Sequence, residues 1–333
     1  MIDVIRMLKD FLKIILRVER RRCKDVFSCD EEMFWRGTHA PFVNDLSRCE
    51  AQIVMHYHVI EKGLTMPDRR LAFGKPIVAQ LMSEVELAAE KFQGHSKTID
   101  HAIGVVKAYW ELHAKEGYAF PEDKAFWGSV CRFVSRYPDV ATARQFSETR
   151  TEFYGDLESP FPVFAKSRHT VRHYTDEAIP ISVIRDAVEL ATTTPSACNR
   201  HHVRVHCIAN RMIARKILQV QGGTRGFGHL ADKALIVTSD LSVEMSPDDS
   251  FDPYVNGGLF LMNLCYSLHY YRIAHCILTC SIPRDRLQQI KTMAKIPPNE
   301  VVVAMLSCGI APNEFDVAAS PKKSADEILS ILE

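Results

Sequence analysis

Apolar residues in the first 137 positions recur at the three- and four-residue steps of a helix. The clearest segment lies between a capping residue, Asn44 or Asp45, and Gly63, which precedes Pro67. Its apolar positions are Cys49, Ile53, Tyr57 and Ile60. Similar periodicity recurs in three later segments, 77–92, 98–114 and 123–137. We therefore predict an all-helical N-terminal domain at residues 1–140.

The pattern changes after a polar stretch that contains Pro138, Gly155 and Pro160. Apolar runs predict three strands, at 203–209, 234–239 and 301–307. Helical spacing predicts a helix that begins near Pro180 and three more, at 211–221, 255–272 and 283–294. We expect a linker at 141–165 and an α+β or α/β domain with buried strands at 166–333.

The first 22 residues form an amphipathic pattern. Their apolar side chains gather near one helical face and are Ile5, Leu8, Leu12, Ile15 and Leu16, before a basic run at Arg20, Arg21 and Arg22. Interrupting charges such as Asp3, Arg6 and Lys9 exclude a transmembrane segment and a signal-peptide core. We expect this helix to pack on the core or on a second subunit, with an anchor on an anionic membrane surface as the alternative.

Charge and cysteine content exclude several classes of protein. Lys plus Arg and Asp plus Glu both number 41, so no net field attracts nucleic acid. The ten cysteines show no ladder of spacings and no pair of CxxC motifs, which argues against a disulfide framework and a structural zinc site. We therefore expect a reducing, cytoplasmic location.

One basic segment has the composition of a phosphate clamp. Arg168, Thr170 and Arg172 alternate along an extended stretch, so their side chains project to the same side. Two forked guanidinium groups and a hydroxyl match the oxygens of a phosphate. The alternative is an exposed basic stretch whose charges pair with Asp176 and Glu177.

A second candidate is the loop Thr194-Pro195-Ser196-Ala197-Cys198-Asn199, which follows an amphipathic helix. Its small side chains let a flat ligand approach the backbone, and Ser196 and Asn199 offer hydrogen-bonding groups for the edge of a heterocycle. Turn formation alone explains the same composition.

The order of these segments resembles the nitroreductase family of flavoenzymes. SRxxVRxY is followed about 20 residues later by PSACN, and the central sequences GTRGFGHLADKALIVTSDL and YVNGGLFLMNLCYSLHYYRIAHCILTC are also similar to that family. The resemblance covers about half of the chain, residues 167–323. It departs from the family pattern at Arg200 and His201, at Arg272 and Ala274, and at Ser324.

The resemblance implies a set of cofactor-binding residues. Arg168, Thr170 and Arg172 correspond to contacts with the phosphate and ribityl chain of FMN, and Lys322 to the last basic phosphate contact. A loop that reaches FMN across a dimer interface corresponds to Pro195, Ser196, Ala197 and Asn199. In the family, backbone groups of one loop face the flavin ring near its N5. The corresponding residues here are Cys276, Ile277 and Leu278.

The resemblance also implies fold and activity. The family fold is an α+β sandwich with a mostly antiparallel sheet, which forms a homodimer with FMN sites at the interface. The implied reaction is ping-pong hydride transfer from NAD(P)H through FMN to a small organic acceptor. The sequence has no GxGxxG motif after a strand, so no Rossmann site is expected, and no catalytic side chain is assigned. The alternative function is a flavin-binding or partner-binding module without nicotinamide-dependent turnover.

Three further features allow two interpretations each. His56 and His58 are too far apart around a helix to share a metal, and His202 and His206 have no evident third ligand, so we expect no metal site. The cysteine pair Cys276 and Cys280 is either redox-active or simply buried. The charged motif at 60–74 is either a substrate lid or partner surface, or a loop that ends a helix.

Overall fold

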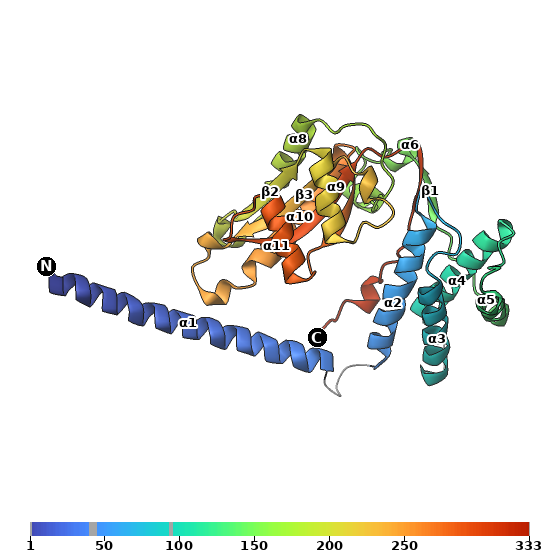
Figure 1. The fold of residues 1–333 in the computed structure, drawn as a ribbon, viewed down its shortest axis with the longest axis horizontal. Coiled ribbons are helices and arrows are strands. Elements are labelled where there is room, and N and C mark those ends of the chain that lie inside the picture. Colours follow the sequence, from blue (N-terminus) through green and yellow to red (C-terminus); the bar gives the residue numbers. More distant parts are fainter. Residues whose placement is uncertain (1, 40–44, 93–95, 333) are drawn as a thin grey trace.

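The computed structural model describes residues 2–39, 45–92 and 96–332 (Figure 1). Its first element, α1 (Ile2–His39), is one straight helix whose N-terminal end lies apart from the other elements in Figure 1. An ion pair between Arg22 and Asp248 joins α1 to the second half of the chain. The cap expected at Asn44 and the apolar side chains between Ile5 and Leu16 lie outside the described residues. No helix in the described part is long and apolar enough to cross a membrane.

Four further helices make up the first half, as the periodicity predicts. They are α2 (Asp45–Leu64), α3 (Lys75–Phe92), α4 (Lys97–Lys115) and α5 (Lys124–Arg136). Ser96 and Asp123 cap α4 and α5 by accepting hydrogen bonds from Ile99 and Phe126. Their apolar faces form one buried cluster, in which Ile53, Leu81 and Ile103 are fully inaccessible to solvent. The described part of 1–137 contains no strand, so the all-helical prediction is confirmed.

The second half contains two antiparallel sheets. The larger has the order β2-β3-β5-β4 and consists of β2 (Val203–Ile208), β3 (Lys233–Asp240), β4 (Ala274–Thr279) and β5 (Glu300–Gly309). The smaller pairs β1 (Phe146–Thr149) with β6 (Glu314–Val317). The stretch expected to be a linker therefore contains β1 and α6 (Arg150–Phe153), followed by α7 (Phe161–Ser167).

Helices cover both faces of the larger sheet. Ala234 and Ile236 of β3 face a cluster that contains α9 (Arg211–Gln221) and α11 (Arg284–Met293). The intervening Leu235 and Val237 face a cluster that contains α8 (Ile181–Ala191) and α10 (Asp252–Tyr270). This alternation is why the four consecutive residues 234–237 are all apolar, because both faces of the strand are buried. The predicted α+β sandwich with a mostly antiparallel sheet is confirmed.

Short 3-10 turns connect these elements. They are η1 (Ala197–Asn199), η2 (Gly228–Leu230), η3 (Leu241–Val243), η4 (Pro247–Asp249) and η5 (Ala325–Glu327). Three strands were not expected: β1 and β6 of the smaller sheet, and β4, which occupies residues that the resemblance assigned to a loop. Strand β4 pairs along its whole length with β5, from Ala274 opposite Gly309 to Thr279 opposite Ala304.

Gly309, at the end of β5, allows Tyr174 to lie against the sheet. A methyl group at position 309 would clash with Cβ and Cγ of Tyr174, which are close to the backbone and cannot swing away. We expect Gly309→Ala to lower the free energy of unfolding by about 2 kcal/mol, the usual cost of overpacking a core. Urea unfolding followed by circular dichroism measures this change.

Gly128 provides the matched control, because a methyl group there would meet only the flexible end of the Arg132 side chain, at 3.4 Å. Gly128 lies inside α5, where alanine is a better helix former by about 0.5–1 kcal/mol. Gly128→Ala should therefore leave stability unchanged or raise it. Equal losses in the two variants would contradict our account of Gly309.

Candidate functional site

The segment 168–173 is neither helix nor strand, and contacts on one of its sides hold it against the larger sheet. The Val171 amide donates to the His275 carbonyl (3.1 Å), and the Tyr174 hydroxyl donates to the carbonyls of Val171 (2.8 Å) and Ser307 (3.2 Å). Val171 and Tyr174 are buried. The alternating residues Arg168, Thr170 and Arg172 all line the cavity described next.

This cavity has a volume of about 850 Å³. Five of the residues that the resemblance singled out line it, namely Arg168, Thr170, Arg172, Ile277 and Lys322. Lys166 brings the number of basic side chains in its wall to four, and none of its described lining residues is an Asp or Glu. A cavity with this composition favours an anionic ligand.

The charge of Arg168 has no counterion among the described residues. Its Nε and Nη1 atoms are buried without a hydrogen-bond partner. Burial, followed by smaller effects of His275 and the Arg168 charge, lowers the pKa of His269 to about 3, and burial together with the Arg168 charge lowers that of His275 to about 4. Burial, then Arg168 and Lys322, also lowers the pKa of His169. The surrounding imidazoles are therefore neutral at pH 7, and the guanidinium remains a net positive charge.

The alternative of a basic stretch paired with nearby acids is wrong. Asp176 lies 3.6 Å from Arg211, and Glu177 lies 2.8 Å from Arg150. Neither carboxylate pairs with Arg168 or Arg172 in the described part of the chain.

The three residues 276–278 divide between the two faces of β4. Ile277 is 39% exposed and lines the cavity, whereas Cys276 and Leu278 are buried in the opposite cluster. The expected loop is wrong here because β5 offers a continuous partner for the apolar run AHCILT. The turn before it places Arg272, one of the departures from the family pattern, in the left-handed region at φ 60°.

Both cysteines of the proposed redox pair are free. Burial raises the pKa of the Cys276 thiol, although the charges of Arg172 and Lys62 oppose this effect. Burial raises the pKa of Cys280 to about 12. Both groups are therefore neutral thiols at pH 7, and the structure supports the interpretation of small buried side chains.

The loop that contains Pro195, Ser196, Ala197 and Asn199 does not line this cavity within one chain. The Ala197 amide donates to Oδ1 of Asn256 in α10 (2.8 Å), and the His201 amide donates to Oγ of Ser196 (3.0 Å). Cys198 (φ 51°) and Asn199 (φ 56°) adopt the left-handed conformation, which costs about 1 kcal/mol each for residues other than glycine.

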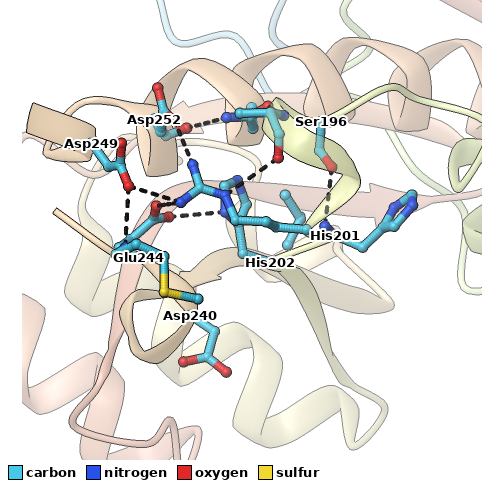
Figure 2. Close-up of polar contacts among 12 residues, drawn as sticks. Ser196, His201, His202, Asp240, Glu244, Asp249 and Asp252 are labelled. Atoms are coloured by element: carbon cyan, nitrogen blue, oxygen red, sulfur yellow. Dashed lines mark hydrogen bonds and ion pairs between the residues drawn. The ribbon is translucent and has the colours of Figure 1, made fainter.

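Arg200 anchors the end of this loop through three carboxylates, which are labelled in Figure 2 as Glu244, Asp249 and Asp252. Its guanidinium lies 2.8 Å from Glu244, 2.9 Å from Asp249 and 2.6 Å from Asp252. The fully buried His202 lies 2.9 Å from Glu244, close enough for an ion pair although the angle does not make a hydrogen bond. The departure at Arg200 thus has a structural account: its three carboxylate contacts hold the strained loop against the start of α10.

Helix α2 supplies a wall of the cavity that the sequence analysis did not identify. Val54, Tyr57 and His58 line it, at the three- and four-residue spacing of one helical face. His56 points elsewhere and lies 2.7 Å from Glu84 of α3, so the two histidines do not share a site. The described residues contain no group of three or more side chains that could hold a metal ion.

Glu61 follows on the same face of α2 and gives a pH-dependent contribution to stability. Burial by itself raises the pKa of its carboxyl, but hydrogen bonds from His101 and His58, the charge of His101 and the Ser320 amide outweigh burial and lower the pKa from 4.5 to about 2. Because the folded pKa lies below the unfolded one, this contribution is complete above pH 4.5 and is lost as the pH falls towards 2.

We expect Glu61→Gln to lower the free energy of unfolding by about 3 kcal/mol at neutral pH, because two histidines lose a buried partner. Below pH 4.5 the difference from the original protein should shrink by up to about 1.4 kcal/mol per pH unit. Urea unfolding of both proteins over this pH range measures the effect. A difference that does not change with pH would contradict the assignment.

Comparison with known proteins matches one part of the chain to a family. Residues 165–224 match the model of the nitroreductase family, and this range contains both SRHTVRHY and PSACN. No curated protein matches the sequence.

Solved structures similar to this chain include three nitroreductase proteins. A nitroreductase family protein from Streptococcus pneumoniae TIGR4 is 17% identical (52% of this chain, 100% of that chain, TM-score 0.45). A nitroreductase-like protein from Streptococcus mutans is 20% identical (52% and 98%, TM-score 0.43). An FMN-dependent nitroreductase from Clostridium difficile R20291 is 15% identical (51% and 98%, TM-score 0.43). The family match confirms the resemblance: over residues 165–224, this chain carries a segment of the nitroreductase family.

Proposed function

We propose that this protein is an FMN-dependent oxidoreductase that takes hydride from NAD(P)H and passes it to a small organic acceptor. The observation that carries the proposal is the cavity of about 850 Å³, whose described lining has four basic side chains and no carboxylate. It lies at the clamp segment of the part of the chain that matches the nitroreductase family.

The residues present fit FMN at both of its ends. Arg168, Arg172 and Lys322 supply positive charge for a phosphate, and Thr170 supplies a hydroxyl. An isoalloxazine ring requires flat apolar walls, which Tyr57, Tyr266, Met262 and Ile277 provide. The volume is also within the usual range of about 300–1,000 Å³ for a cofactor site.

When bound, FMN supplies the redox chemistry, in which hydride enters from NAD(P)H and leaves to the acceptor in separate ping-pong half-reactions. The side chains of this protein bind, orient and exclude water. We therefore assign cofactor contacts to the clamp, to Lys322, to the Ile277 side chain and to the backbone of residues 276–278, and we assign no catalytic side chain. All ten cysteines are free thiols, and we propose a cytoplasmic location on that basis.

We further propose a homodimer with the FMN sites at its interface. Four half-exposed apolar side chains follow one face of α10 from its start, namely Phe251, Tyr254, Val255 and Leu259. Met262 and Tyr266 continue along α10 into the cavity wall, and Asn256 holds the 195–199 loop on the same helix. A second copy on this face would bring its own Pro195–Asn199 loop towards the cavity.

The first test is cofactor binding. Purified protein should be yellow, or take up FMN, and should lose the flavin absorption anaerobically with NADH or NADPH. Arg168→Met should weaken FMN binding by about 10- to 100-fold, since a charged hydrogen bond contributes about 1.5–3 kcal/mol. Riboflavin, which lacks the phosphate, should bind both proteins equally. Arg132→Met, at an exposed arginine of α5, is the control.

Two results would separate the proposal from its alternatives. A protein that takes up no FMN contradicts it. A protein that binds FMN but whose spectrum is unchanged by either nicotinamide is instead a flavin-binding or partner-binding module, with the helical half as the contact surface.

The second test is assembly. Light scattering should give twice the 37.8 kDa mass of one chain, and Leu259→Glu should shift the protein to monomers, because a charge on the α10 face opposes burial. Leu87→Glu, at a similarly exposed leucine of α3, should remain dimeric. If both variants remain dimers, the interface does not lie on α10.

A further inference from the structure

A single buried carboxylate connects the helical half to the C-terminal chain. Glu61 lies on α2 and is 0% exposed, on the face whose preceding residues Val54, Tyr57 and His58 line the cavity. It cannot contact a ligand itself, because no solvent reaches it. Its role must therefore act through the groups that it holds.

Three segments that are distant in sequence meet at this carboxylate. Oε1 of Glu61 lies 2.8 Å from Nε2 of His101 in α4 and accepts a hydrogen bond from the Ser320 amide (3.3 Å). Oε2 lies 3.3 Å from Nδ1 of His58, and the same nitrogen lies 3.4 Å from Oγ of Ser320. The contact with His101 joins α2 to α4, whereas the contacts with Ser320 join α2 to the C-terminal segment 318–322.

Ser320 is placed to control Lys322. Residues 318–322 all line the cavity, and Lys322 is one of its four basic side chains. Ser320 adopts the left-handed region (φ 39°), which is unfavourable for a residue other than glycine and requires contacts that hold it. The hydrogen bond from its amide to Glu61 is such a contact.

We propose that Glu61 and His58 form a latch that positions Lys322 in the cavity, so that the helical half is a working part of the anion site. Glu61 is a positioning residue in this proposal, and Lys322 contacts the ligand. The proposal rests on the proposed function where it takes this anion to be the phosphate of FMN. It follows from this proposal that the charged motif at 60–74 is connected to the cofactor site through Glu61.

The experiment compares FMN with riboflavin, which differs by the phosphate alone. Affinities are measured by flavin fluorescence for the full chain, Glu61→Gln, Lys322→Met and the double variant. Each single variant should bind FMN about 10-fold more weakly, and riboflavin affinity should stay unchanged. The double variant should lose no more than Lys322→Met alone, because both changes remove the same contact.

Glu84→Gln is the matched control, since Glu84 pairs with His56 between α2 and α3 without touching residues 318–322. It should keep its FMN affinity. If Glu61→Gln does not fold, Ser320→Ala replaces it, because alanine removes the hydroxyl contact with His58 without relieving the left-handed backbone; a selective two- to fivefold loss of FMN affinity is then expected.

An equal loss of affinity for FMN and for riboflavin in Glu61→Gln would show a general structural role and overturn the latch. Unchanged FMN affinity in that variant, or additive losses of FMN affinity in the double variant, would also overturn it. If the original protein binds no FMN, the proposed function fails separately. The same four proteins are then titrated with inorganic phosphate, and binding is measured as the rise of the unfolding midpoint. The latch is still supported if phosphate no longer stabilises either single variant and the double variant shows no further loss. The latch is overturned if phosphate still stabilises Glu61→Gln.

Discussion

The organisation of this protein depends on positive charge that its own described residues leave uncompensated. Arg168 and Arg172 face a cavity without a lining carboxylate, and two nitrogens of Arg168 are buried without a partner. Placing like charges together is unfavourable, so other contacts must hold the backbone that carries them. Tyr174 and Val171 provide this support through their hydrogen bonds to β5 and β4. The sheet thus holds positive charges that the anion we propose as ligand would compensate.

The cavity is shared between parts of the chain that fold around different cores. The sheet half contributes the clamp and Ile277, the C-terminal chain contributes 318–322, and α2 contributes its apolar face. Because α2 borders the same space, changes in the helical half can alter which ligands fit without changing the clamp. This arrangement would let the helical half act on specificity while the sheet keeps the proposed cofactor contacts.

The loop at 195–199 shows a second use of electrostatics. Its left-handed residues are locally unfavourable, and Arg200 offsets their cost by contacts with three carboxylates around the start of α10 (Figure 2). The same helix presents the apolar face of Phe251, Tyr254, Val255 and Leu259 to solvent. A loop held rigidly beside an apolar face is suited to contact a second copy without a further loss of chain entropy.

Local patterns in the sequence determined the helical half, three of the four strands in the larger sheet, and the shared direction of Arg168, Thr170 and Arg172, because side-chain periodicity is a property of neighbouring residues. They did not reveal β4, since its partner β5 lies some 25 residues onward in the chain and decides that AHCILT extends. Nor did they reveal Glu61, whose contact with Ser320 spans 259 positions. Pairing between distant segments leaves no periodic trace, so only the tertiary structure brought the clamp, Lys322 and α2 to one cavity.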